Sequence, residues 1–138
     1  MPYPKKKPVK AFELPSSYVA VDLETTGLSP YKDRIIEIGA VKVVEGSAIN
    51  EFETLVSINA PFSAEAQRIS GITPDMLKGA MKESEAIAAF MRFCGSLPLV
   101  GHNAKAFDAL FIEQALKRSK MDESPIWVDT MKLAGELY

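Results

Sequence analysis

Two carboxylates follow an apolar segment at a point where a buried strand would carry none. Residues 18–21 run directly into Asp22-Leu23-Glu24. Because side chains alternate along a strand, Asp22 and Glu24 share one face and Leu23 lies on the other. At a separation of about 6.5 Å their repulsion is roughly 2.5 kcal/mol at an effective dielectric constant near 20. A cation relieves that repulsion, and an oxygen-only ligand set favours Mg²⁺ or Mn²⁺ over Zn²⁺. The alternative is a solvated strand end before a Thr-Gly turn, and the pair alone does not separate the two readings.

A third carboxylate, Asp108, lies on an otherwise apolar helix face. It shares that face with Phe111, Ile112 and Ala115, at spacings of three, four and seven residues. An Asp in a first helical turn can simply interact with the helix dipole, which contributes about 0.3–1 kcal/mol. Burial towards a sheet argues against that role, because an unpaired buried carboxylate costs more. Ligands of open α/β sheets collect beyond the carboxyl ends of the strands, so we expect all three acids to converge there on a two-metal site.

The composition bounds the class of protein. With 138 residues, 47% of them hydrophobic, the chain fits one compact domain. A formal charge of -2 provides no broad basic field, so a nucleic acid would have to be held by local groups or by metal ions. The single cysteine, Cys94, cannot form an intramolecular disulfide and fits core packing, which favours a cytoplasmic location. No apolar run approaches the length of a membrane span, and we expect no membrane association.

The order of elements predicts an α/β fold. Residues 1–15 are rich in Pro and Lys and indicate a tail. Three strands are expected next, with a hairpin turn at 45–47 that makes the second and third antiparallel. Short helices follow within 61–79, where Thr73 is a candidate N-cap before Pro74. The expected strands are residues 17–24, 34–44, 48–58, 97–101 and 126–128, and the expected helices are about 82–94 and 104–118, with Asp129 capping a last helix.

This pattern indicates an open mixed sheet, with a three-strand antiparallel meander plus parallel strands and flanking helices. Four motifs follow one another along the chain: Val21-Asp22-Leu23-Glu24-Thr25-Thr26-Gly27-Leu28, Arg34-Ile35-Ile36-Glu37-Ile38-Gly39-Ala40, Ser70-Gly71-Ile72-Thr73, and Gly101-His102-Asn103-Ala104 leading to Phe107-Asp108. Taken in order, they resemble the DnaQ-like DEDD 3′–5′ exonucleases of the DEDDh type, and most of all the proofreading epsilon subunits of bacterial DNA polymerase III.

The resemblance implies a ribonuclease H-like fold and a set of site residues. Asp22 would be shared by two divalent cations, Mg²⁺ or Mn²⁺, with Glu24 on the first and Asp108 supporting the second. Thr25, Thr26 and Leu28 would contact the terminal nucleotide, and Asn103 would join them in binding substrate. Asn103 to Asp108 holds one residue more than the commonest family spacing, and we expect the extra residue in the loop before the helix.

The family completes its site with a His followed by an Asp on a later helix, and the chain stops before such a motif. His102 is expected to pack in its loop rather than act as the base, and Asp129 to cap a helix. Residues 16–138 would then be an exonuclease domain that is C-terminally incomplete, either a fragment or a naturally shortened relative, with very weak activity alone. Apolar surface uncovered by a lost helix predicts self-association.

The resemblance implies a metal-dependent exonuclease that releases nucleoside monophosphates from single-stranded or frayed DNA 3′ ends, in proofreading or repair, with a DNA polymerase as a candidate partner. Two alternatives stay open. One is a truncated, catalytically impaired module that binds nucleic acid or a polymerase. The other is RNA trimming, because recognition of a 2′-hydroxyl cannot be read from these residues.

Overall fold

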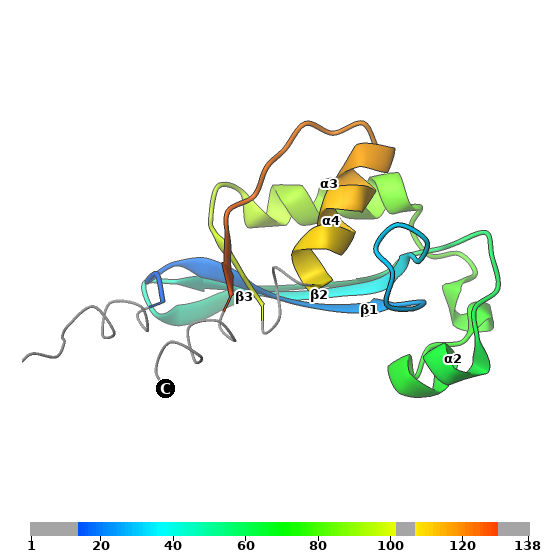
Figure 1. Cartoon of the computed structure of the whole chain (residues 1–138). Coiled ribbons are helices and arrows are strands. Elements are labelled where there is room, and N and C mark those ends of the chain that lie inside the picture. Colours follow the sequence, from blue (N-terminus) through cyan, green and yellow to red (C-terminus); the bar gives the residue numbers. More distant parts are fainter. Residues whose placement is uncertain (1–13, 102–106, 130–138) are drawn as a thin grey trace, which may run out of the picture.

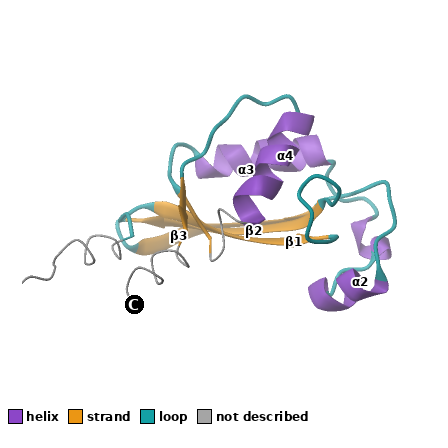
Figure 2. Cartoon of the chain, in the orientation of Figure 1, coloured by secondary structure: helices purple, strands orange, loops and turns teal. Residues whose placement is uncertain are grey.

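A computed structural model describes residues 14–101 and 107–129, with the side chain of Asp129 excluded. Five strands form one sheet in the order β3-β2-β1-β4-β5. Figures 1 and 2 show α3 and α4 packed together on one face of this sheet, while α2 lies beyond one end of it. The expected mixed sheet with flanking helices is therefore confirmed.

The first three strands form the expected antiparallel meander. They are β1 (Tyr18–Thr25), β2 (Ile35–Val44) and β3 (Ser47–Leu55). The hairpin between β2 and β3 turns through Glu45 and Gly46, which have φ values of 48° and 82°. The third strand ends at Leu55, earlier than the predicted Ile58. Just beyond it, Val56 N still donates to Ile36 O at 2.9 Å, and Val56 forms an isolated parallel bridge with Met81.

Two short strands extend the sheet in parallel. β4 (Leu99–Gly101) pairs with β1, and β5 (Trp127–Asp129) pairs with β4. All three residues of β4 are buried, as expected of a central parallel strand. The carboxyl ends of β1, β4 and β5 consequently point the same way, and these ends position the candidate site.

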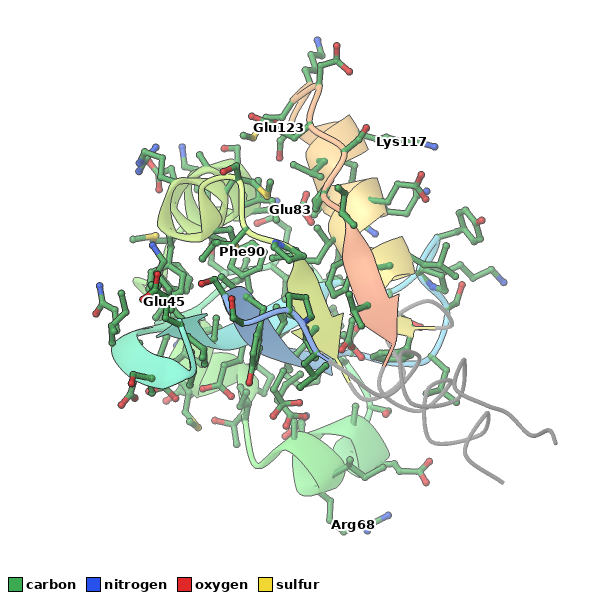
Figure 3. The ribbon with its side chains drawn as sticks, turned by 90° about the vertical axis from the view of Figure 1, so that its left-hand side faces the viewer. Glu45, Arg68, Glu83, Phe90, Lys117 and Glu123 are labelled. Carbon is green, nitrogen blue, oxygen red and sulfur yellow. The ribbon has the colours of Figure 1, made fainter. Side chains whose placement is uncertain are left out.

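The helices over the sheet bury the apolar stripes that the sequence predicts. α3 (Glu83–Cys94) buries Ile87, Phe90 and Cys94, and α4 (Ala109–Arg118) buries Phe111 among other residues. Figure 3 shows Phe90 pointing from α3 towards the sheet. Its ring centroid lies 6.0 Å from that of Phe52 on β3. Burial raises the pKa of the Cys94 thiol to about 12, so the expected core role of this cysteine is confirmed.

The segment between β3 and α3 holds two short helices, as predicted. α2 (Ala64–Ser70) begins at Ser63, whose hydroxyl accepts a hydrogen bond from Ala66 N, and ends at Gly71 in the left-handed region. The 3₁₀ helix η1 (Pro74–Leu77) begins at Thr73, so the predicted cap before Pro74 is confirmed. Buried Ile36, Ile72 and Leu77 form a second apolar cluster that attaches this segment to β2.

The helix expected over about 104–118 is present as α4 from Ala109 to Arg118, and Phe107 and Asp108 form a wider, π-type turn before it. Such turns are frequent at functional sites. Residues 104–106, where the predicted start falls, lie outside the described residues. The Pro/Lys-rich tail up to residue 13, His102, Asn103 and the helix expected after Asp129 lie outside the described residues. In the described ranges, no helix combines the length and apolar character that crossing a bilayer requires.

Candidate active site

Asp22 and Glu24 lie on the face of the sheet opposite to α3 and α4. Strand alternation buries Val21 and Leu23 in the core, leaves Asp22 exposed and leaves Glu24 half-buried. The predicted shared face of the two carboxylates is therefore confirmed. No side chain separates Asp22 from β3, because its partner on β2 is Gly39, and Gly39 in turn is paired with Glu53.

The neighbouring strands add two acids that the motif reading did not single out as site residues. Glu37 on β2 is the direct cross-strand partner of Glu24, and Glu53 lies on β3. Burial, followed by repulsion from Asp22, raises the pKa of Glu24. The pKa of Glu37 is also raised, by burial first and then by a hydrogen bond and repulsion from Glu53, with smaller effects of Glu24 and Asp22. This face of the sheet therefore concentrates negative charge.

Two hollows meet these carboxylates. One, of about 330 Å³, lies over Asp22, Gly39 and Glu53. The other, of about 310 Å³, lies where β1 ends; its lining comprises Leu23, Glu24, Thr25, Thr26, Gly27, Leu28, Ser63, Glu65, Ala66, Ile69 and Phe107. We call this second hollow the terminal pocket. It joins the end of β1 to α2 and to the turn before α4.

The terminal pocket has an apolar rim beside an acidic wall. Leu28 is 84% exposed and Ile69 is 69% exposed, although both are large apolar residues. They line the pocket together with Phe107, while Glu24 and Glu65 provide its carboxylates. A few polar groups within an apolar lining are typical of small-molecule sites. This arrangement can hold a flat apolar group next to a concentration of negative charge.

The loop between β1 and β2 is fixed by its own polar groups. Thr25 Oγ1 donates a hydrogen bond to Gly27 O at 2.7 Å. Thr26 Oγ1 donates to Asp33 Oδ1 at 3.2 Å and accepts from Arg34 N at 3.0 Å. The two threonines predicted to bind substrate therefore line the terminal pocket while their hydroxyl groups hold the loop.

Gly27 is required in this loop for a steric reason. A Cβ atom on Gly27 would lie 2.7 Å from Asp33 Cγ, closer than real Cβ contacts come. Asp33 is held in that place by hydrogen bonds from Thr26 and from Ser29 N. Close packing against a carboxylate therefore explains why glycine occupies this turn position.

Asp108 lies at the N-cap of α4, half-buried, with α-helical φ and ψ of -60° and -44°. Its neighbour Phe107 lines the terminal pocket together with Glu24. The structure thus brings the Asp108 segment to the end of β1, but Asp108 itself lines neither hollow. Across residues 14–101 and 107–129, no group of three or more Asp, Glu, His or Cys side chains is placed to hold a metal ion.

The donor set present nevertheless fits a hard divalent cation in part. Asp22 and Glu24 offer carboxylate oxygens only. Burial first, and then repulsion from Asp22, raises the pKa of Glu24, and a cation would relieve the second of these effects. The sequence did carry a signal for Glu37 and Glu53. Each directly follows an apolar residue in its strand, and this alternation places it on the sheet face opposite to α3 and α4. Their relation to Glu24 needed the strand register, which the sequence alone did not supply.

Comparison with known proteins identifies the family. A family model described as an exonuclease, RNase T, matches residues 19–138. The PolC-type DNA polymerase III of Latilactobacillus sakei subsp. sakei (strain 23K) is 38% identical over 125 residues, covering 89% of this chain and 8% of that protein. The PolC-type enzyme of Bacillus cereus (strain ATCC 14579) is 40% identical over 124 residues, covering 88% of this chain and 8% of that protein. The chain thus spans a small part of these relatives.

Solved structures support the same fold. Exonuclease I in its apo form matches with a TM-score of 0.76 and 18% identity, over 86% of this chain and 30% of that chain. E. coli Exonuclease I in complex with a dA16 oligonucleotide matches with a TM-score of 0.76 and 18% identity, over 87% and 29%. The ribonuclease H-like sheet expected from the motifs is confirmed by this likeness. Because the family model covers residues 19–138, the chain belongs to the exonuclease family.

Proposed function

We propose that this domain is a metal-dependent 3′–5′ exonuclease that hydrolyses phosphodiester bonds at DNA 3′ ends and releases nucleoside monophosphates. The observation that carries the proposal is the terminal pocket, which places Glu24 beside the exposed apolar side chains of Leu28 and Ile69. A pocket of about 310 Å³ is within the range for one small ligand such as a nucleotide. Its position at the end of β1 follows the general rule for ligand sites in α/β sheets.

The residues divide into two roles. Asp22, Glu24 and Asp108 would hold two divalent cations, Mg²⁺ or Mn²⁺. When bound, these ions activate water and stabilise the developing charge on the phosphate and the leaving oxygen. Leu28, Ile69 and Phe107 would contact the base or sugar of the last nucleotide, and the hydroxyl groups of Thr25 and Thr26 hold the loop that carries Leu28. Asn103, which the motif resemblance implies as a further substrate contact, lies outside the described residues and stays part of the proposal.

The preferred substrate is a single-stranded or frayed DNA end. A terminal nucleotide must leave its stack to enter a pocket beside the carboxylates, and unpaired ends do so at the lowest cost. The solved Exonuclease I structures include complexes with single-stranded DNA, and the curated relatives are DNA polymerase III proteins. These likenesses support a role in replication proofreading or repair, in the cytoplasm and in association with a polymerase.

The test uses the full-length gene product and single-stranded DNA labelled at its 5′ end. With Mg²⁺ or Mn²⁺ the label should move through a ladder that shortens from the 3′ end, and a circular strand of the same sequence should stay intact. Glu24→Gln should lower the rate by at least about 10²-fold, on the scale of losing one catalytic group. Glu45→Gln, at the β2–β3 hairpin, removes the same charge far from the pocket and should leave the rate unchanged.

Two results would overturn the proposal in different directions. Tight DNA binding without nucleotide release, in every divalent cation tested, would assign a binding module instead. Equal or faster shortening of an RNA strand of the same sequence would assign RNA trimming, because the site would then accept a 2′-hydroxyl.

A further inference from the structure

A second, larger groove borders the terminal pocket and differs from it in charge. It measures about 770 Å³, and its lining comprises Thr26, Lys32, Asp33, Arg34, Ile58, Asn59, Ala60, Pro61, Phe62, Ser63, Glu83 and Arg118. We call it the basic groove. Thr26 and Ser63 line both hollows, so the two lie side by side across these residues. A strand whose last nucleotide occupies the terminal pocket can therefore continue into the basic groove.

The basic groove offers uncommitted positive charge. Lys32 is exposed and Arg34 is half-buried, and neither forms an ion pair with any carboxylate of the described residues. Within residues 14–101 and 107–129, the Arg34 guanidinium makes only long hydrogen bonds, of 3.5 and 3.4 Å, to the backbone oxygens of Lys32 and Asp33. These weak contacts leave most of its five donor positions available to a phosphate.

The acids of the basic groove are already engaged. Asp33 accepts hydrogen bonds from Thr26 and Ser29. Glu83 accepts two from Arg118, at 2.9 and 2.7 Å, so that pair forms a neutral part of the wall. In a chain whose formal charge is -2, the cations of Lys32 and Arg34 make a local positive site beside an acidic one.

The basic groove is also held in shape before any ligand binds. Thr26 N donates to Arg34 O at 2.9 Å, and Asp33 N donates to Ser29 O at 2.8 Å. These bonds close the loop that carries Lys32 and Arg34. On the facing segment, Phe62 packs against the buried cluster of Ile36, Ile72 and Leu77 and leaves part of its surface in the groove. A preformed site of this kind binds with a smaller loss of conformational entropy.

We propose that the basic groove binds the phosphodiester backbone of the DNA strand just upstream of the terminal nucleotide, through Lys32 and Arg34. This inference rests on the proposed function, because the terminal pocket must hold the 3′ nucleotide for the strand to be placed. Lys32 and Arg34 would then hold the substrate strand and set the minimum length that binds well. They would take no part in the chemical step. The protein should then prefer strands of several nucleotides over dinucleotides.

The test measures binding of 5′-fluorescein dT10 and dT2 to the full-length gene product by fluorescence anisotropy, with Ca²⁺ in place of Mg²⁺. Lys32→Ala/Arg34→Ala should weaken dT10 binding about tenfold and reduce the slope of log K against log salt by about 1.4, at about 0.7 for each phosphate contact of a single strand. Binding of dT2 should not change. The control Lys78→Ala/Arg92→Ala removes one Lys and one Arg that are exposed and do not line the basic groove.

A modified strand separates direct contact from general electrostatics. In dT10 with neutral methylphosphonates at the second and third linkages from the 3′ end, the wild type should lose affinity. The double variant should lose little more, because the same contacts are already gone. Two results would overturn the inference. One is that the losses from the methylphosphonates and from the double variant add; the other is that the double variant binds dT10 as tightly as the wild type. The groove would then serve another anion, such as an acidic peptide.

Nucleotide release with Mg²⁺ is recorded on the same preparations. A wild type that shortens DNA, but whose affinity does not respond to Lys32→Ala/Arg34→Ala, overturns the basic groove alone. A wild type that neither binds nor shortens DNA overturns the proposed function and this inference with it.

Discussion

Glu24 and Glu37 are direct partners across the antiparallel β1–β2 register. Like charges at such a position destabilise a sheet. Both carboxyl groups have a raised pKa, with burial as the first cause in each. The sheet therefore keeps, on its open face, an arrangement of like charges that lowers the stability of the protein at neutral pH.

Replacing Glu37 should stabilise the protein at neutral pH. A group whose folded-state pKa is raised contributes stability below its unfolded pKa, and that contribution is lost as the pH rises through the folded value. Glu37→Gln, which stays neutral, should raise the free energy of unfolding by about 0.5–1 kcal/mol at pH 8. The difference should shrink towards zero near pH 4. Urea unfolding at several pH values measures it.

The matched control for that experiment is Glu45→Gln, which removes one negative charge at the exposed β2–β3 turn. It should change the free energy of unfolding little at either pH. If Glu37→Gln and Glu45→Gln gave the same pH profile, the effect would reflect net charge, and the Glu24–Glu37 relationship would carry no special energy.

Divalent cations should stabilise the folded protein through Asp22. An ion that binds only the native state adds about 2.7 kcal/mol when its concentration is 100 times its dissociation constant. Mn²⁺ should therefore raise the melting temperature of the wild type. Asp22→Asn should melt higher than wild type in EDTA, because repulsion on Glu24 is lost, and should gain little from Mn²⁺. An equal Mn²⁺ gain in both proteins would place the ion elsewhere.

Much of the fold could be predicted from local patterns. Alternation identified β1, and the stripe of Ile87, Phe90 and Cys94 identified α3, because burial against one sheet face imposes those periods. The π-type turn at Phe107 and Asp108 could not be predicted, since these two residues have the composition of ordinary helix.

The sequence predicted the first acid pair of the candidate site but not the residues that surround that pair. Asp22 and Glu24 share a face for a reason that lies within one strand. The roles of Glu37 and Glu53 depend on pairing between three strands, and the pocket contact of Ile69 depends on how α2 packs against the end of β1. Neither the pairing between strands nor the packing of α2 can be predicted from the periodicity of one segment.

A methyl group at Gly27 should damage the β1–β2 loop. Gly27→Ala would bring Cβ against the Asp33 carboxylate, which Thr26 and Ser29 hold in place. Overpacking of this kind costs about 1–3 kcal/mol. Thermal or urea unfolding should show that loss, together with weaker binding of a DNA 3′ end, since Leu28 would shift.

The matched control is Gly39→Ala. A Cβ atom there meets only Asp22 O, at 3.7 Å, an ordinary contact. In a strand, that change should leave stability equal or slightly higher, because alanine restricts the unfolded chain. Equal destabilisation by both substitutions would show that the contact between Gly27 and Asp33 is not tight.

The ion pair between Glu83 and Arg118 should couple the start of α3 to the end of α4. Its side chains are only 23% and 25% exposed, and both guanidinium–carboxylate hydrogen bonds are short. A bidentate, partly buried ion pair is stronger than a solvent-exposed one. A double-mutant cycle with Glu83→Gln and Arg118→Gln should therefore give a coupling energy of about 1 kcal/mol.

The same cycle on Glu65 and Arg68 in α2 provides the reference, because that pair is 73% and 72% exposed and its closest approach is 3.8 Å. Its coupling should be near zero. Similar couplings for the two pairs would mean that the Glu83–Arg118 pair is solvated in solution. Arg118 would then be available to a ligand in the basic groove, and the charge-neutral double variant Glu83→Gln/Arg118→Gln would weaken dT10 binding. An Arg118 engaged by Glu83 predicts no such loss.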